Sequence, residues 1–386
     1  MKEIKNLKKT AKRIKKAIKS GEKIIIYGDA DLDGTSSALI LEESIRNLEG
    51  KVERIYFPDR EKEGYGINKK ALNYLKPLAP ALLISVDCGI GNFEEVEIAK
   101  EMGFEVIIID HHKVLEKVPD ASIVVDPKQE GDEYPFKEFA NTGIIYKLAG
   151  VLLGKKLKGS LNQSFLELVA LATIADMMVQ VDENSLFIME GLRFLPKTVR
   201  PGLRAFWELG FVKQKEGTSK RTAGKITSVL NAAGVNKDHL TDCYVLLTAF
   251  DREEANKAAQ FLIEKKEEKK AMIEDITWEI KKRVIDGFKK PLIFEGDENW
   301  PLAFAGSSAS KICREFKEPV FIFKKGKKLS KGAVRTPKGI DSVEAMSSCA
   351  DLLETFGGHP LASGFTVKTS KLKDFEACLI DYFNKL

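Results

Sequence analysis

The sequence contains few cysteines and no long apolar run, and both absences narrow the range of functions. Its 386 residues include five cysteines, an odd number with no C-x-x-C pair among them. This pattern argues against a disulfide framework and against a thiolate zinc site. No apolar stretch is long enough to span a bilayer, and no early stretch resembles the core of a signal peptide. We therefore expect a soluble, cytoplasmic protein with no membrane partner.

The chain also lacks a strong excess of either charge. Its 62 basic and 57 acidic residues give a net charge of +5, which permits a polyanionic partner without requiring one. The first twenty residues are an exception, because they hold nine basic residues and one acid, with apolar residues at helical spacing. We predict a basic amphipathic helix over residues 1–20. It either covers a domain edge with a solvated outer face or presents a patch to nucleic acid.

Internal repeats and low-complexity tracts are absent, and a hydrophobic content of 44% is sufficient for two cored domains. Short β-branched runs at residues 23–28, 52–57, 81–87, 105–110 and 122–126 alternate with helical patterns such as 35–48 and 93–102. Continuous apolar strands separated by helices predict an α/β fold with a parallel sheet covered on both faces. Ligands of such sheets bind beyond the carboxyl ends of the strands.

The pattern changes in the second half of the chain. Residues 164–250 are mostly helical in pattern, and residues 252–284 predict one or two long charged helices that Gly287 and Pro291 terminate. A smaller α/β domain is expected to follow. Its predicted strands cover residues 291–295, 319–325 and 363–368, and its predicted helices cover residues 310–316 and 342–356.

Four of the five predicted strands of the first domain run into an aspartate. The acids at these ends are Asp29 with Asp31 and Asp33, then Asp87, Asp110 and Asp126. In a parallel sheet they would converge on one edge, where carboxylates repel each other unless cations neutralise them or their pKa values rise. Metal binding is the simpler explanation. For Asp126, which precedes Pro127, we expect a turn role instead.

The acidic triplet suggests a local geometry. Extended alternation would point Asp29, Asp31 and Asp33 the same way, and Gly34 would allow a tight turn before a helix capped by Thr35 or Ser36. This arrangement would direct three carboxylates at one ligand.

Histidines support a metal site. Two of the four histidines, His111 and His112, directly follow Asp110 at a strand end. Imidazole and carboxylate together suit Mn²⁺, Mg²⁺, Fe²⁺ or Zn²⁺, and the excess of oxygen ligands favours Mn²⁺, with Mg²⁺ second. Asp176 either marks the exposed end of a buried helix or closes the metal shell. His359 lies in the turn-prone segment 357–360, and His239 is expected to be structural.

Several segments together resemble a known family. GDADLDG, SVDCGIG, IIDHHK and TIADMM, in this order, resemble the four signature segments of the DHH phosphoesterase superfamily, and FGGHPLASGF resembles a segment of its DHH-associated second domain. PDREKEGYGIN (58–68), RPGLRAFWELG (200–210) and LNAAG (230–234) resemble the RecJ-like single-strand-specific exonucleases. The resemblance implies a phosphoesterase domain over 1–250, a connecting helix over 251–286 and a DHH-associated substrate-binding domain over 287–386.

The resemblance also implies roles for individual residues. Asp31 and Asp33 would each bind one of two divalent ions, with Asp29 beside them. Asp87 would bridge the two ions, and His111 and Asp176 would complete the set of ligands. A further set would contact the scissile phosphate or its neighbours, and it comprises His112, Arg335, Gly357, Gly358 and His359. Asp87, His111 and His112 are then the catalytic candidates.

The implied activity is two-metal hydrolysis of single-stranded DNA to 5′-mononucleotides. Two alternatives remain, namely hydrolysis of short oligonucleotides or of phosphoadenosine phosphate, and a catalytically silent binding role. Leu230 and Val235 stand where arginines are usual, and Ala333 stands where serine is frequent, which implies weaker phosphate contacts. Because the chain ends at Leu386, we expect no appended oligonucleotide-binding barrel. Long strands would then bind weakly unless the basic helix or a replication or repair protein contributes.

Overall fold

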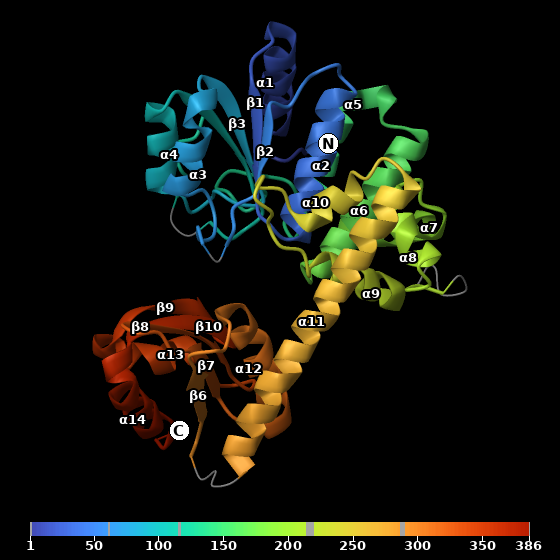
Figure 1. Ribbon diagram of the computed structural model, residues 1–386. Coiled ribbons are helices and arrows are strands. Elements are labelled where there is room, and N and C mark those ends of the chain that lie inside the picture. The colour runs from blue at the N-terminus through green and yellow to red at the C-terminus, as the bar shows by residue number, and fades with distance from the viewer. Residues whose placement is uncertain (1, 61, 115–116, 214–219, 286–289, 386) are drawn as a thin grey trace. The chain divides into compact units, whose positions relative to one another are not determined.

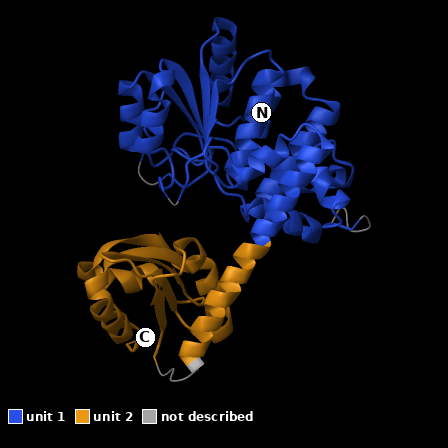
Figure 2. Cartoon of the chain, viewed as in Figure 1, with its two compact units in different colours: residues 1–266 blue, residues 267–386 orange. Residues whose placement is uncertain are grey.

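The computed structural model describes residues 2–60, 62–114, 117–213, 220–285 and 290–385. The chain divides into two compact units, residues 1–266 and 267–386 (Figures 1 and 2). The boundary between them falls inside helix α11 (Arg252–Ile285), a single helix of 34 residues. The predicted domain boundary at 286–287, and with it Gly287, lies outside the described residues.

Unit 1 contains a parallel sheet of five strands in the order β2-β1-β3-β4-β5, as predicted. The strands are β1 (Ile24–Gly28), β2 (Arg54–Tyr56), β3 (Ala81–Val86), β4 (Phe104–Ile109) and β5 (Ile123–Val125). They are almost entirely apolar and buried because helices cover both faces of the sheet.

Alternate strand residues pack against different helices. Ile24 and Ile26 belong to the core formed with α1, α2 and α5, whereas Ile25 and Tyr27 belong to the core formed with α3 and α4. The bounds of these helices are α1 (Leu7–Ser20), α2 (Leu32–Arg46), α3 (Lys69–Leu75), α4 (Phe93–Glu101) and α5 (Asn141–Leu153). Figure 1 shows α3 and α4 together on one side of the sheet.

The remainder of unit 1 is helical, as the sequence predicts. It contains α6 (Gly159–Ala175), α7 (Asp182–Phe194), α8 (Pro201–Glu208), α9 (Lys220–Leu230) and α10 (Asp242–Leu247), with short 3-10 turns η1 (Lys76–Leu78), η2 (Gly154–Lys156) and η3 (Leu195–Lys197). The amino-terminal helix α1 is amphipathic, with Leu7, Ala11, Ile14 and Ala17 buried. Its Lys9, Lys12 and Lys16 are exposed.

Unit 2 is built on a mixed five-stranded sheet in the order β6-β7-β8-β10-β9. Its strands are β6 (Ile293–Asp297), β7 (Val320–Lys324), β8 (Leu329–Arg335), β9 (Leu353–His359) and β10 (Ala362–Lys368). Its other elements are α12 (Leu302–Phe316), α13 (Ser342–Ser347), η5 (Ala350–Leu352), η6 (Thr369–Lys371) and α14 (Leu372–Phe383). Strands β8 and β9 and helix α14 were not predicted from the sequence.

Two sequence-based expectations for unit 2 are wrong. The helix predicted over 342–356 ends at Ser347, and residues 353–359 form β9 because β10 pairs with them in antiparallel register. Cys349 and Cys378, 29 residues apart, form a disulfide that the cysteine pattern did not reveal.

Within the described part of the chain, no helix has both the length and the apolar character needed to cross a membrane.

Candidate metal centre

The strand order of unit 1 places a ligand site beyond the carboxyl ends of β1 and β3. These two strands are neighbours in the order β2-β1-β3-β4-β5, and the chain leaves them in opposite directions across the sheet. A crevice at such a switch point is the usual ligand site of a doubly wound sheet. Asp29 follows β1 and Asp87 follows β3, so two of the predicted acids lie at this point.

The acidic triplet differs from its predicted extended form. Helix α2 begins at Leu32, directly after its N-cap Asp31, whose Oδ1 accepts hydrogen bonds from the backbone N–H of Asp33 (3.0 Å) and Gly34 (3.1 Å). The expectation that Thr35 or Ser36 caps this helix is therefore wrong. Asp31 satisfies the free N–H groups of the first turn, and Asp33 lies within that turn.

Asp33 is buried and receives several hydrogen bonds from the start of α5. Its carboxylate accepts from the backbone N–H of Asn141 (2.7 Å) and Thr142 (2.8 Å), and the Thr142 hydroxyl also donates to it. The positive end of the helix dipole stabilises a carboxylate at this position. Neither Asn141 nor Thr142 was recognised from the sequence, because more than 100 residues separate them from Asp33.

Asp87 has a left-handed backbone with a φ of 63°, an uncommon conformation for a residue other than glycine. Its backbone N–H donates to the Ile109 carbonyl at 3.0 Å, which ties it to the end of β4. Its Oδ1 is buried, has no hydrogen-bond partner among the described residues, and lies 3.2 Å from Nε2 of His111. A buried carboxylate oxygen without a donor is a place where a cation fits.

The His111 ring is oriented for ligation. Its Nδ1 lies 2.8 Å from the Phe139 carbonyl, which can only accept, so Nδ1 carries the proton and Nε2 presents its lone pair. That Nε2 faces Asp87, Asp176 at 3.7 Å and Asp33 at 3.9 Å. Burial lowers the pKa of His111, which favours the neutral form that binds metals.

Asp110 supports this site through hydrogen bonds. One oxygen of the buried carboxylate accepts from the Ile90 N–H, and the other accepts from the backbone N–H groups of His111 and His112 and from Nδ1 of His112 at 2.7 Å. Its oxygens already have these donors, so we regard Asp110 as a positioning residue although it lies close to the ligands. Burial alone would lower the pKa of His112, but the hydrogen bond and charge of Asp110 raise it.

Arg60 is a further residue that the sequence did not single out. Its Nε lies 2.7 Å from Asp29, its Nη2 also contacts Asp29, and the same nitrogen lies 2.9 Å from Asp31. The guanidinium lies over the ring of Tyr65, with 5.6 Å to the centroid, and the Tyr65 hydroxyl lies 3.4 Å from the His112 ring. Both residues belong to the segment 58–68, whose resemblance to the RecJ-like exonucleases was the available signal.

Asp176 and Asp126 have different environments. Asp176 is the C-cap of α6, and its half-buried side chain lies close to His111 and Asp33. Asp126 accepts from the Lys128 N–H at 2.7 Å in a turn, as expected. Burial raises the pKa of each carboxyl to about 7.

The electrostatics of the cluster favour a bound cation. Three groups of ligand atoms each lie within 4.8 Å of one another, namely Asp29–Asp31–Asp87, Asp33–His111–Asp176 and Asp87–Asp110–His111–His112. Burial raises the pKa of Asp29, Asp33 and Asp87, so their ionised forms are costly without a counter-charge. Carboxylates with one imidazole suit Mn²⁺ or Mg²⁺.

The remaining predicted residues lie in unit 2. Arg335 ends β8 and is in register with Ala362 of β10, which in turn is in register with His359 at the end of β9. Arg335 donates to Ser310 Oγ at 3.1 Å and to the Val334 carbonyl at 2.7 Å. Gly357, Gly358 and His359 are exposed strand residues rather than the predicted turn. Together these residues mark one end of the unit 2 sheet.

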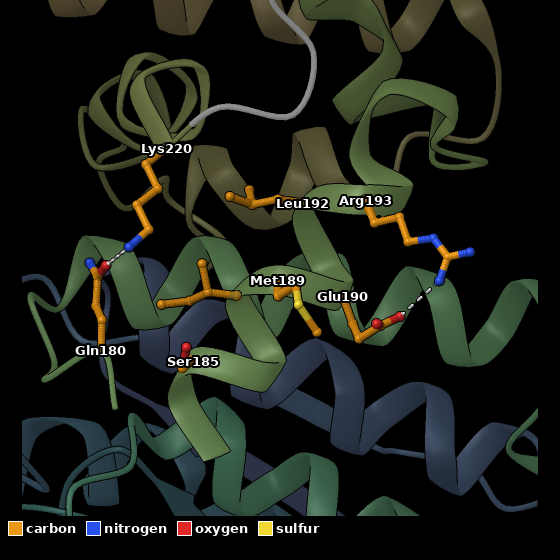
Figure 3. Close-up of a pocket in the computed structure, with 8 residues that line it drawn as sticks. Gln180, Ser185, Met189, Glu190, Leu192, Arg193 and Lys220 are labelled. Atoms are coloured by element: carbon orange, nitrogen blue, oxygen red, sulfur yellow. Dashed lines mark hydrogen bonds and ion pairs between the residues drawn. The ribbon is translucent and has the colours of Figure 1, made fainter. Parts of the chain in front are cut away.

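A cavity of about 690 Å³ opens elsewhere in unit 1, beside α7 and the start of α9 (Figure 3). Its described lining is largely apolar, and its polar groups pair with each other, since Lys220 donates to Gln180 and Arg193 pairs with Glu190. None of the predicted site residues lines it. The aspartate and histidine cluster is therefore the better candidate for chemistry.

Comparisons with known proteins agree with this arrangement. The profile of the DHH family, N-terminal domain, matches residues 23–173, and that of the DHHA1 domain matches residues 289–385. The chain therefore carries a DHH family domain followed by a DHHA1 domain. Two curated relatives are single-stranded-DNA-specific exonucleases named RecJ. The Bacillus subtilis protein is 36% identical to this chain, and the match covers 98% of this chain and 48% of that protein. The Thermus thermophilus protein is 30% identical, and the match covers 97% of this chain and 54% of that protein.

Two solved RecJ structures are similar to this chain in fold. The structure of exonuclease RecJ bound to manganese has a TM-score of 0.83 and 28% identity, and the match covers 100% of this chain and 96% of that one. RecJ of Thermus thermophilus in complex with Mn²⁺ has a TM-score of 0.82 and 25% identity, over 99% of this chain and 55% of that one. This chain spans about half the length of the two curated relatives.

Proposed function

We propose that this chain is a two-metal phosphodiesterase that hydrolyses single-stranded DNA to 5′-mononucleotides. The observation that carries the proposal is the gathering of Asp29, Asp31, Asp33, Asp87, His111 and Asp176 at the switch point of the unit 1 sheet. The names of the two RecJ relatives supply the substrate, since both are described as specific for single-stranded DNA.

The proposed ligands fall into two sets that share Asp87. Asp31 and Asp87, with Asp29 beside them, would hold one ion, and Asp33, Asp87, His111 and Asp176 would hold the other. We propose Mn²⁺ as the ion used, with Mg²⁺ as the alternative. Such ions activate water and stabilise charge on phosphoryl oxygens. A cytoplasmic location and a role in DNA repair belong to the same proposal.

The chain's own residues contribute orientation and protons. The Phe139 carbonyl fixes the His111 tautomer, and the backbone and hydroxyl donors of Asn141 and Thr142 hold the Asp33 carboxylate in place. The contact with Asp110 raises the pKa of His112 and so favours the protonated ring, which can donate a hydrogen bond to an anionic phosphate oxygen. Arg335, Gly357, Gly358 and His359 are proposed to bind substrate in the DHHA1 domain, which we place at residues 287–386.

Substitution of Asp87 tests the site. Asp87→Ala should abolish hydrolysis of every substrate and the binding of at least one ion, as measured by calorimetric titration with Mn²⁺. Asp120→Ala is the matched control, because this carboxylate is exposed and pairs only with Lys100 among the described residues. Activity of Asp87→Ala within a few-fold of the parent would remove Asp87 from the site.

Strand length tests the substrate class. We would incubate the protein with Mn²⁺ and labelled single strands of about 3, 12 and 40 nucleotides, a range that brackets typical single-strand site sizes. An exonuclease should degrade all three. Turnover of only the shortest strand would assign the chain to the oligonucleotide or phosphoadenosine phosphate hydrolases instead.

A further inference from the structure

The hairpin between β7 and β8 of unit 2 holds a concentration of positive charge. Five lysines lie within its eight residues 324–331, with no acid among them: Lys324, Lys325, Lys327, Lys328 and Lys331. All five are exposed. The ion pairs described for lysines of unit 2 involve other positions, such as Lys281, Lys290 and Lys368. We call this segment the lysine hairpin.

The lysine hairpin carries an electrostatic cost in the isolated chain. Lys324 and Lys331 are direct partners in the antiparallel pairing of β7 and β8, and like charges in that position are destabilising, by about 0.2–1 kcal/mol. Asp297 of β6 is the neighbour of Lys324 on its other side, but its carboxylate pairs with Arg283 at 3.1 Å. The charge of the lysine hairpin therefore remains available for an anion from outside.

The backbone that carries these lysines is fixed. The Lys325 N–H donates to the Asp297 carbonyl at 2.9 Å, the Thr369 N–H donates to the Lys328 carbonyl at 2.9 Å, and the Thr369 hydroxyl donates to the Gly326 carbonyl at 2.7 Å. A Cβ on Gly326 would lie 2.1 Å from the Leu329 carbonyl oxygen, so only glycine fits. A fixed backbone lowers the entropy lost when the lysines bind a ligand.

A partly exposed strip of the unit 2 sheet connects the lysine hairpin to the end of the sheet that is proposed to bind substrate. Lys331 is in register with Thr366 of β10, and Thr366 is in register with Thr355 of β9. Four residues further along β10, about 13 Å away, Ala362 is in register with Arg335 and His359. Helix α12 packs on β7 and β8, whereas Thr355, Gly357 and His359 are exposed. Figure 1 shows β8, β10 and β9 side by side.

We infer that the lysine hairpin binds the phosphates of the same single DNA strand whose other part lies at His359 and Arg335. The inference rests on the proposed function for the identity of the strand. A row of lysines suits a polyanion with evenly spaced charges, and small or polar residues on the strip leave room for its backbone. The lysine hairpin is thereby a contact surface for longer strands, separate from the proposed metal ligands.

The test compares two triple variants of the full chain. Lys325→Gln, Lys327→Gln and Lys328→Gln together remove charge from the lysine hairpin, and Lys9→Gln, Lys12→Gln and Lys16→Gln remove equal charge from the exposed face of α1. Binding of a fluorescent thymidylate strand of about 30 nucleotides would be measured by anisotropy with a chelator present, between about 50 and 200 mM salt. Hydrolysis of a trinucleotide in Mn²⁺ would be measured in parallel.

We expect the hairpin variant to bind the long strand at least about 20-fold more weakly at low salt. Loss of three phosphate contacts should reduce the slope of log affinity against log salt concentration by about 2 in magnitude. Between about 50 and 200 mM salt the parent should therefore lose about 20-fold more affinity than the variant. Trinucleotide hydrolysis should be unchanged. Unaltered binding, or an equal loss in the α1 variant, would overturn the inference. If the parent binds the strand but hydrolyses nothing, the proposed function fails while the binding series still decides the inference.

Discussion

Gly34→Ala should destabilise the protein, although alanine is the better helix former. Gly34 is the third residue of α2, and a Cβ there would lie 2.3 Å from the Asp29 carbonyl oxygen, 2.7 Å from its nitrogen and 2.8 Å from its carbonyl carbon. All three are backbone atoms, so they cannot rotate away as a side chain would. In an open helix the same change stabilises by about 1 kcal/mol. Here overpacking should cost about 1–3 kcal/mol.

The same substitution should weaken metal binding, because Asp29 must move. We expect Mn²⁺ affinity to fall by about 10–100-fold, the usual effect of disturbing the supports of a metal site. Denaturant unfolding gives the stability change, and calorimetric titration gives the affinity. Gly224→Ala is the matched control and should gain stability, since this exposed glycine lies in α9 and, apart from its own helix, no atom of the described residues lies within 4 Å of the added Cβ. A gain of stability in both variants would refute the reasoning.

Three further predictions test the supports of the site and a buried acid. Thr142→Val, which removes a hydroxyl donor to Asp33, should reduce Mn²⁺ affinity about tenfold, while Thr142→Ser should retain it; equal affinities in a titration would contradict the role of the hydroxyl. Asp110→Asn should lower kcat about 10–100-fold and leave the unfolding midpoint nearly unchanged, whereas full activity would show that the position of His112 is unimportant. Burial raises the pKa of Glu167 from 4.5 to about 7, so the folded state keeps a proton that the unfolded state loses. Glu167 should therefore contribute a fall of about 3 kcal/mol in the free energy of unfolding as pH rises from about 4.5 to 7. Glu167→Gln should remove this contribution and reduce the pH slope in urea unfolding series, leaving the share of Asp126 and Asp176, whose pKa values are also raised to about 7; an unchanged pH slope would exclude Glu167 as a source.

The sequence by itself determined the parallel sheet of unit 1 and the edge at which its acids gather. Runs such as residues 81–86 and 104–109 are apolar except for Ser85 and Glu105, a composition typical of a strand buried on both faces. Since all five strands run the same way, Asp29, Asp87 and Asp110 had to share one edge. Strand ends are local features of the chain, so a single sequence specifies them.

Only the tertiary structure decided how the site is supported and how unit 2 is paired. Asp33 belongs to helix α2 rather than to an extended segment. The helix begins at Leu32 because Asp31, as its N-cap, accepts hydrogen bonds from the first turn. The Thr142 and Phe139 groups that hold Asp33 and His111 come from distant parts of the chain. Residues 353–359 became a strand because β10 offered backbone partners, and strand formation at such an exposed edge depends on its neighbour more than on local preference.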